Sequence, residues 1–152
     1  MLKLSTNISL SAARLRRTHQ RLLMLDATYK KIGVLVFQFI QRQFQTSGAY
    51  GGTFPWPPLK ESTLRAKRRE RYSSMPLIRT GDLKQKWGIE LGRNRVTVRS
   101  HVGYSGYHQH GTRHLPARPM LPDERQALEL AARTIKGDVG KAIAETLRVP
   151  VR

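Results

Sequence analysis

The chain has 152 residues, a length that suits one domain or one domain with an additional arm. Its 28 lysines and arginines against 10 acidic residues give a formal net charge of +18, which favours polyanionic partners, either nucleic acid or an acidic protein. The absence of cysteine excludes disulfides and thiolate metal sites, and no apolar run reaches the roughly 20 residues that a membrane-spanning helix needs. We therefore expect a soluble, intracellular protein without a membrane partner.

Residues 1–25 are predicted to form a basic, helical N-terminal arm. Apolar residues recur there at three- and four-residue spacing, and no acidic residue precedes Asp26. The arm contributes three residues to a predicted basic patch: Arg14, Arg16 and Arg17. A single domain is predicted over 26–148, followed by a short tail at 149–152.

A second helix is predicted to start at Asp26, whose carboxylate can accept the unpaired amides of the first turn. Phe37 and Phe44 belong to its broad apolar surface. A helix this apolar must be largely buried, either in the core or against another subunit. It is expected to end near Thr46, because the glycine-rich segment 47–52 cannot sustain it.

The segment 53–79 is predicted to be extended at first and helical afterwards. The prolines around Trp56 push their preceding residues out of the helical region, whereas 63–72 can form a short, charged helix. This helix supplies the second part of the basic patch: Arg65, Lys67, Arg68, Arg69 and Arg71. Two interpretations stay open, a solvated face or a surface that neutralises phosphates. Trp56 likewise either stacks on a base or anchors the extended segment to the core.

A β-hairpin is predicted next, because residues 87–91 and 96–99 alternate in polarity and a turn-forming segment joins them. Residues 101–104 are expected to prolong the second strand. The stretch 102–121 is predicted to be a loop in which three glycines, Gly103, Gly106 and Gly111, allow tight bends.

A final helix is predicted from Asp123 to about Arg148, since one apolar stripe stays in phase across Gly137. The expected fold class is α+β, with a small antiparallel sheet packed against two or three long helices.

No catalytic or metal site is predicted. His108, His110 and His114 lie close together, but their spacing matches no zinc motif and no carboxylate occurs between Glu90 and Asp123. The acidic residues are scattered, and no nucleophile elbow, phosphate-binding loop or metalloprotease helix is present. We therefore expect no enzyme, no cofactor and no small-molecule substrate.

An ordered set of landmarks resembles one known family. The landmarks are Trp56-Pro57-Pro58-Leu59, Thr63, Lys67, Pro76-Leu77-Ile78-Arg79-Thr80-Gly81-Asp82-Leu83, Val102-Gly103-Tyr104, Tyr107-His108-Gln109-His110-Gly111-Thr112 and Pro116-Ala117-Arg118-Pro119. Together they span about 27–148 and resemble the phage virion-morphogenesis, or tail-completion, family of Mu-like and other contractile-tailed phages. Lys84-Gln85-Lys86 departs from the family, which usually has a small polar residue in that region.

The resemblance implies a structural protein of the virion that is assembled in the host cytoplasm. Similar proteins form rings, commonly hexamers, at the neck of the particle, between the tail tube and sheath on one side and the head connector on the other. DNA passes through the ring, so non-specific contact with DNA is expected in its lumen. The alternatives are a head-side adaptor or stopper and, from another class, a basic DNA-binding accessory protein.

A ring needs interfaces in which one surface patch meets a different patch on the neighbouring subunit. The candidate interface residues are Tyr104, Tyr107, His108, Arg118, Phe37 and Phe44. Arg118 is expected to tie the last helix either to the sheet or to a neighbouring subunit. Four further residues are expected to hold the fold: Trp56, Gly81, Gly111 and Pro119.

Overall fold

A computed structural model of the protein describes residues 26–52, 54–92 and 95–147. The predicted N-terminal arm, with Arg14, Arg16 and Arg17, and the predicted tail at 149–152 lie outside the described residues. The elements are, in order, α2 (Asp26–Gln45), the 3₁₀ turn η1 (Tyr50–Gly52), α3 (Glu61–Arg69), α4 (Asp82–Gln85), β1 (Trp87–Gly92), β2 (Arg95–Ser100), α5 (Ser105–His110) and α6 (Glu124–Leu147).

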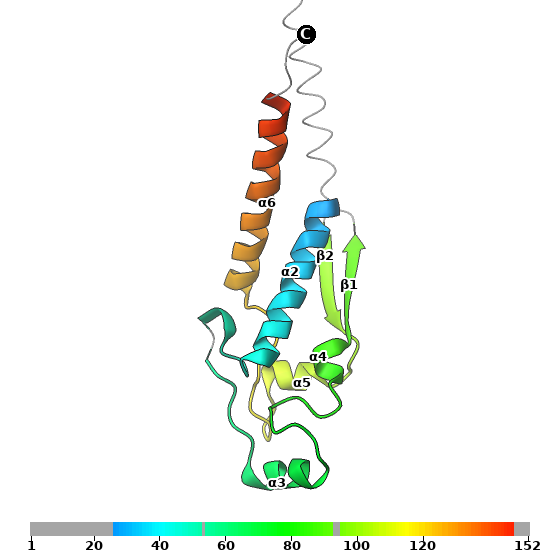
Figure 1. Ribbon diagram of the computed structural model, residues 1–152, viewed down its shortest axis with the longest axis vertical. Helices are drawn as coiled ribbons and strands as arrows, with labels where there is room; N and C mark the ends of the chain where they lie inside the picture. Colours follow the sequence, from blue (N-terminus) through cyan, green and yellow to red (C-terminus); the bar gives the residue numbers. More distant parts are fainter. Residues whose placement is uncertain (1–25, 53, 93–94, 148–152) are drawn as a thin grey trace, which may run out of the picture.

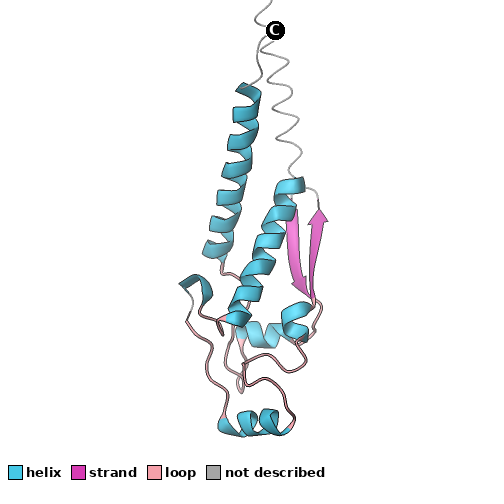
Figure 2. Ribbon diagram, viewed as in Figure 1, coloured by secondary structure: helices cyan, strands magenta, loops and turns pink. Residues whose placement is uncertain are grey.

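The arrangement confirms the expected α+β fold. The long helices α2 and α6 run beside each other, and the β1–β2 hairpin lies against α2 (Figures 1 and 2). The short helices α4 and α5 lie near the C-terminal end of α2, and α3 stands beyond them at the tip of the molecule (Figure 1). The described residues therefore form a long body with a small protruding helix at one end.

The core lies where the second half of α2 meets the irregular segments that follow it. Ile40 and Phe44 of α2 are buried there together with four residues from elsewhere in the chain: Trp56, Leu83, Val102 and Met120. The rings of Phe44 and Trp56 meet edge to face with their centroids 5.3 Å apart, which is a favoured geometry for aromatic pairs. The core thus joins α2 to the proline-rich segment, to α4 and to the stretch after β2.

The hairpin packs closely on α2 because position 33 of the helix is a glycine. A Cβ atom on Gly33 would lie 2.6 Å from Cγ2 of Ile89 and 2.9 Å from Cγ2 of Val96. The two strands are antiparallel, with Trp87 opposite Ser100. Within the described residues the sheet has only these two strands, so the outer edges of both β1 and β2 are unpaired.

Two expectations about the stretch after β2 are wrong. The strand ends at Ser100 instead of continuing through residues 101–104, because Val102 turns inward and is buried in the core. Residues 105–110 then form α5 where a loop was expected, although Gly106 and the aromatic residues of this segment are poor helix formers. Of the three glycines expected to make bends, only Gly111 has a positive φ, of 77°.

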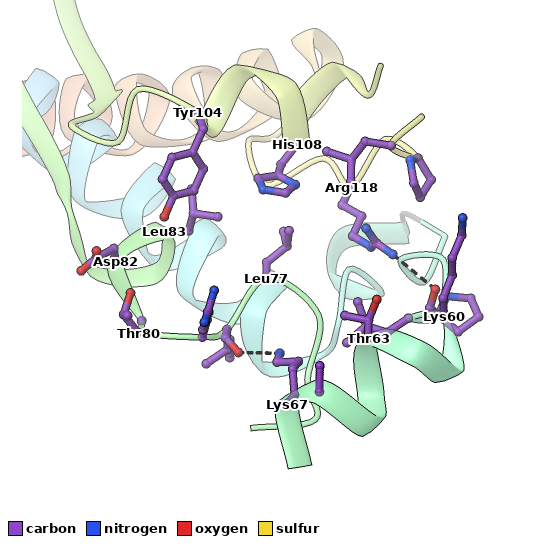
Figure 3. Close-up of a pocket in the computed structure, with 18 of the residues that line it drawn as sticks. Lys60, Thr63, Lys67, Leu77, Thr80, Asp82, Leu83, Tyr104, His108 and Arg118 are labelled. Carbon is purple, nitrogen blue, oxygen red and sulfur yellow. Dashed lines mark hydrogen bonds between the residues drawn. The ribbon is translucent and has the colours of Figure 1, made fainter. Parts of the chain in front are cut away.

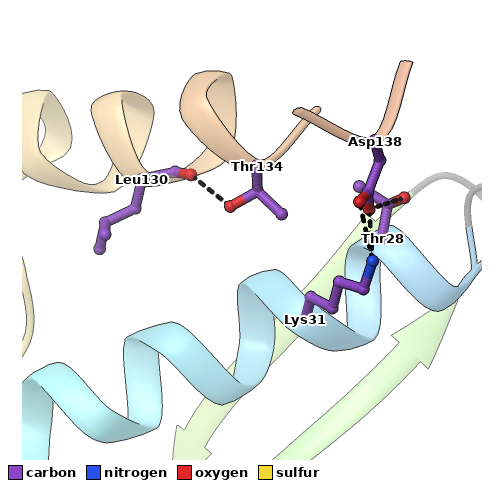
Figure 4. A network of polar contacts seen from close by, with 5 residues as sticks. All are labelled: Thr28, Lys31, Leu130, Thr134 and Asp138. Atoms are coloured by element: carbon purple, nitrogen blue, oxygen red, sulfur yellow. Dashed lines mark hydrogen bonds and ion pairs between the residues drawn. The ribbon is translucent and has the colours of Figure 1, made fainter. Parts of the chain in front are cut away.

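A polar contact joins α6 to the start of α2 (Figure 4). Asp138 accepts hydrogen bonds from the hydroxyl of Thr28, at 2.8 Å, and from Nζ of Lys31, at 2.8 Å. The bonds from Lys31 and then Thr28 lower the pKa of Asp138, since both favour the charged carboxylate. The side of α6 that carries Asp138 therefore faces α2.

The N-terminus of α6 is closed by a reciprocal pair of hydrogen bonds. The backbone N–H of Gln126 donates to Oδ1 of Asp123 at 2.7 Å, and the N–H of Asp123 donates to Oε1 of Gln126 at 3.0 Å. From this cap the helix continues across Gly137 without a break, as its sequence pattern predicts.

The apolar stripe of α6 is only half covered. Positions 127, 130, 134 and 138 share the side that faces α2. Leu128 and Ile135 lie about 100° away around the helix axis, at the 3.6-residue period of an α-helix. Their side chains are 68% and 37% exposed. The stripe seen in the sequence is therefore partly covered and partly exposed, and none of its described residues is fully buried.

Replacing Gly33 with valine should lower the free energy of unfolding by about 2 kcal/mol, because the added methyl groups collide with the stiff side chains of Ile89 and Val96. Gly137→Val is the matched control, since nothing lies within 4 Å of a Cβ at that helical position. Chemical denaturation of the two variants measures the difference. Equal effects of the two substitutions would contradict the close packing of the hairpin on α2.

Candidate functional site

A groove of about 600 Å³ lies between α3 and α5 (Figure 3). One wall is α3 with the extended segment before it, and the other is α5 with the loop 114–118. Residues 77–83 form the floor between the two walls. The groove therefore depends on how two irregular segments of the chain are held against each other.

Two side chains fix these segments together. The indole Nε1 of Trp56 donates to the carbonyl of Pro119 at 2.8 Å. In the opposite direction, Arg118 donates from Nε and Nη2 to the carbonyl of Pro57, at 3.1 and 2.9 Å, and from Nη2 to the carbonyl of Pro58, at 3.3 Å. We call this reciprocal pair, Trp56 and Arg118 with their carbonyl partners, the Trp–Arg clasp. Because proline has no N–H, these segments cannot pair as strands, and side-chain donors take that role.

The α3 wall is held by an internal lysine. Nζ of Lys67 donates to the carbonyl of Met75 at 2.7 Å and to that of Ile78 at 2.6 Å, so it fastens the chain that returns from α3. The helix runs from Glu61 to Arg69, which is shorter at its C-terminal end than the predicted 63–72, and Arg71 beyond it has a left-handed φ of 58°. None of the residues of α3 is buried, so the helix is a protrusion and not a part of the core.

Two glycines shape the ends of the groove. Gly81 precedes α4 with a φ of 89°, and its carbonyl accepts hydrogen bonds from the N–H groups of Lys84 and Gln85. Gly111 ends α5 with a φ of 77°, and a Cβ there would lie 2.8 Å from the backbone nitrogen of Ala117. This close approach brings the loop 112–117 back so that the N–H of Arg118 reaches the carbonyl of His108 at 2.7 Å.

His108 and Tyr104 come from α5 and the residue before it, and they stand over the groove (Figure 3). Their rings meet edge to face with centroids 5.9 Å apart. Nδ1 of His108 is buried without a hydrogen-bond partner among the described residues. Burial lowers the pKa of His108, and the positive charge of Arg118 lowers it further.

The predicted basic patch divides into two groups. Arg65, Arg68 and Arg69 are exposed on α3, and Arg71 is exposed just after it. Lys67 does not belong to that surface, because its ammonium points inward to the two carbonyls described above. The arginines at the tip thus remain candidates for contact with a polyanion, and Lys67 is corrected to a groove residue.

The predicted interface residues also separate. Tyr104 and Tyr107 are exposed, and His108 and Phe37 are half-buried. Phe44 is only 1% exposed and belongs to the core, so its proposed place in an interface is wrong. Arg118 is 5% exposed and braces its own chain through the Trp–Arg clasp, which favours the internal alternative over the intersubunit one.

Several exposed apolar residues were not predicted as site residues. They are Phe54 of the proline-rich segment, Ile89 and Leu91 of β1, Leu128 and Ile135 of α6, and Val34 of α2. The periodicity of the helix and strand residues predicts an apolar face, but periodicity alone does not tell whether the same chain covers that face. Leu77 and Leu115, which line the groove, lie in irregular segments, where periodicity gives no signal of burial.

Two negative findings concern the described part of the chain. No group of three or more histidine, cysteine, aspartate or glutamate side chains there is placed to hold a metal ion. None of the helices described is long and apolar enough to cross a membrane.

A comparison with protein families identifies the chain. A model of the phage virion morphogenesis family matches residues 6–148, which is most of the sequence, and the chain belongs to this family. No curated protein and no solved structure matches the chain. Membership in a family of structural and assembly proteins indicates a role in building the phage particle and an association with the virion.

Arg118→Ala should lower the free energy of unfolding by about 2–3 kcal/mol, because it removes charge-assisted bonds and leaves the carbonyls of Pro57 and Pro58 without a donor. Arg113→Ala is the matched control in the same loop, since Arg113 is exposed. Chemical denaturation of the monomeric protein decides the point. A variant at position 118 as stable as the control would contradict an internal brace.

The stability of the protein should decrease between about pH 7 and about pH 5.5, partly through His108. Its pKa is lowered in the folded state from an ordinary value of 6.5, so the unfolded chain takes up the proton first as the pH falls. His108→Phe keeps a ring against Tyr104 and removes the titration, so we expect a smaller loss of stability over this range. If denaturation shows the same loss in both proteins, His108 is not the group responsible.

Proposed function

We propose that the protein is a ring subunit at the head–tail neck of the phage, acting in tail completion as a tail terminator. In this role several copies, by analogy six, close into a ring that joins the tail to the head connector and lets DNA pass. The observation that carries the proposal is an apolar surface left uncovered on the body of a protein that belongs to a virion morphogenesis family.

The uncovered surface has two parts. Leu128 and Ile135 form an exposed apolar stripe along α6. Leu91 is 48% exposed on β1, whose outer edge is unpaired within the described residues, whereas Ile89 is partly covered by α2. Monomeric proteins rarely leave such surfaces open along regular elements, because a partner chain gains free energy by covering them. Two different patches on one chain suit the heterologous contacts from which a ring is built.

The tip of the molecule supports a second part of the proposal. The guanidinium groups of Arg65, Arg68 and Arg69 are on an exposed helix that adds nothing to the core. Arginines that protrude in this way can meet phosphates in a ring lumen, or acidic surfaces of the adjacent ring. A head-side adaptor or stopper would use the same surfaces, and placement in the particle distinguishes these roles.

A DNA-binding accessory protein is less well supported. Stacking on single-stranded bases needs exposed aromatic rings beside the cations. Trp56 is buried in the core, and the ring of Tyr72 is covered by the guanidinium of Arg79, 5.0 Å from its centroid, which leaves Phe54, 93% exposed, as the ring of this segment that is open for stacking. An isolated protein that binds DNA tightly, with a steep dependence on salt, would revive this alternative.

The double substitution Leu128→Gln and Ile135→Gln should prevent ring formation while leaving the monomer folded, because both side chains are already exposed to solvent. Glutamine keeps the helix propensity of α6. Arg133→Gln, on another side of the same helix, is the control.

Mass photometry of the purified protein, alone and with tails that lack their completion protein, measures assembly. We expect rings with the native chain and the control, and monomers with the double variant. A native chain that stays monomeric even with tails would contradict the proposal.

A further inference from the structure

We infer that the groove between α3 and α5 binds a carboxylate-bearing, otherwise apolar peptide segment of a neighbouring virion protein, with Arg118 as the group that receives the carboxylate. The inference rests on the proposed function only in taking a virion protein as the partner. It concerns the groove and not the ring contacts, so it can be tested separately.

The charges along the groove are not balanced. Its lining includes four lysines and arginines and two carboxylates: Lys60, Lys67, Arg79, Arg118, Glu70 and Asp82. Both carboxylates are already paired, Glu70 with Arg79 at 2.7 Å and Asp82 with Lys86 at 3.1 Å. Arg118 and Lys67 form no ion pair among the described residues and donate only to backbone carbonyls. The groove therefore keeps a net positive charge.

The backbone carbonyls accept hydrogen bonds from Arg118 and Lys67 but do not neutralise their positive charges. Burial lowers the pKa of Arg118, and it is the largest cause of the lowered pKa of Lys67, with the charge of Arg79 second. A buried cation without a counter-ion is held at a cost in solvation free energy, which an incoming carboxylate would reduce. The groove is thus better suited to an occupied state than to an empty one.

Both cations retain unused donors. A guanidinium has five N–H groups, and the bonds of Arg118 use only Nε and Nη2, so Nη1 is free of any acceptor among the described residues. An ammonium has three, of which Lys67 uses two. The unpartnered Nδ1 of His108 is a third polar atom on the same lining. Figure 3 shows Tyr104, His108 and Arg118 on one wall and Lys67 on the other.

The rest of the groove lining is apolar and favours a peptide in which apolar residues flank the acidic one. Leu77, Ile78, Leu115, Ala66 and the ring of Tyr104 line the groove. A volume of about 600 Å³ is in the range of sites that enclose several side chains, and it is far larger than a single small anion needs. A peptide with one acidic residue between apolar ones matches both the charge and the walls.

The groove fits a protein partner better than DNA or a second copy of this chain. The carboxylates of Glu70 and Asp82 and the apolar lining disfavour a phosphodiester backbone with its regular charges. A second copy is a poor source of an acidic peptide, because the chain has 10 acidic residues against 28 basic ones.

The test starts from a display library of short random peptides, selected on the immobilised full-length protein. We expect selected peptides that combine one aspartate or glutamate with adjacent apolar residues. Fluorescence anisotropy then compares a labelled selected peptide with its Asn or Gln counterpart. Loss of a charge-assisted bond should weaken binding about tenfold or more.

Two variants on α3 locate the site. Thr63 lines the groove and stands near Arg118 (Figure 3), whereas its neighbour Ser62 is exposed and does not line it. Thr63→Glu supplies a competing carboxylate from within the groove and should weaken the peptide about tenfold, while Ser62→Glu should change binding less than about twofold. Both substitutions are compatible with the first turn of a helix, so folding is preserved.

The other outcomes overturn the inference. Selected peptides without a carboxylate would show that the groove does not require one. Equal binding of the acidic peptide and its Asn or Gln counterpart would show the same. Equal effects of the two variants would move the site away from the groove. Displacement of the peptide by duplex DNA would make the groove a phosphate site. Rings that form on tails while no acidic peptide binds would leave the proposed function standing and refute this inference alone.

Discussion

The Trp–Arg clasp is the contact on which the rest of the structure depends. The segments around residues 54–60 and 114–121 are rich in proline, so they can neither continue a helix nor pair as strands. Each segment supplies one side-chain donor to the carbonyls of the other, and Trp56 also brings its ring into the core against Phe44. Side-chain hydrogen bonds therefore join these two irregular segments, where strand pairing is not possible.

The clasp separates two ends with different chemistry. Beyond it, α3 carries exposed arginines and contributes nothing to the core, and the groove beneath it is positively charged. On the body, α6 and β1 present apolar side chains to solvent. In the proposed ring, the apolar surfaces would contact other copies of the chain and the cationic surfaces would contact other components.

The sequence predicted the elements with regular patterns well and the site poorly. The α2 and α6 helices, the hairpin and the cap at Asp123 follow from periodicity and local hydrogen bonding, and the family follows from the order of short landmarks. Burial could not be read in the same way: Phe44 and Leu128 both belong to apolar stripes, yet one is core and the other is exposed. Lys67 was assigned to a basic surface, and Arg118 was left between the sheet and a neighbouring subunit, because their carbonyl partners lie in segments without any pattern.

The central claim is that this protein closes into a ring at the junction of head and tail. A cryo-EM reconstruction of the neck in the mature particle tests it most directly. The account predicts a closed ring of identical copies around the DNA, with Leu128 and Ile135 covered by a neighbouring subunit and the arginines of α3 turned toward DNA or an adjacent ring. A particle whose neck lacks this chain, or a ring in which the α6 stripe stays exposed to solvent, would contradict it.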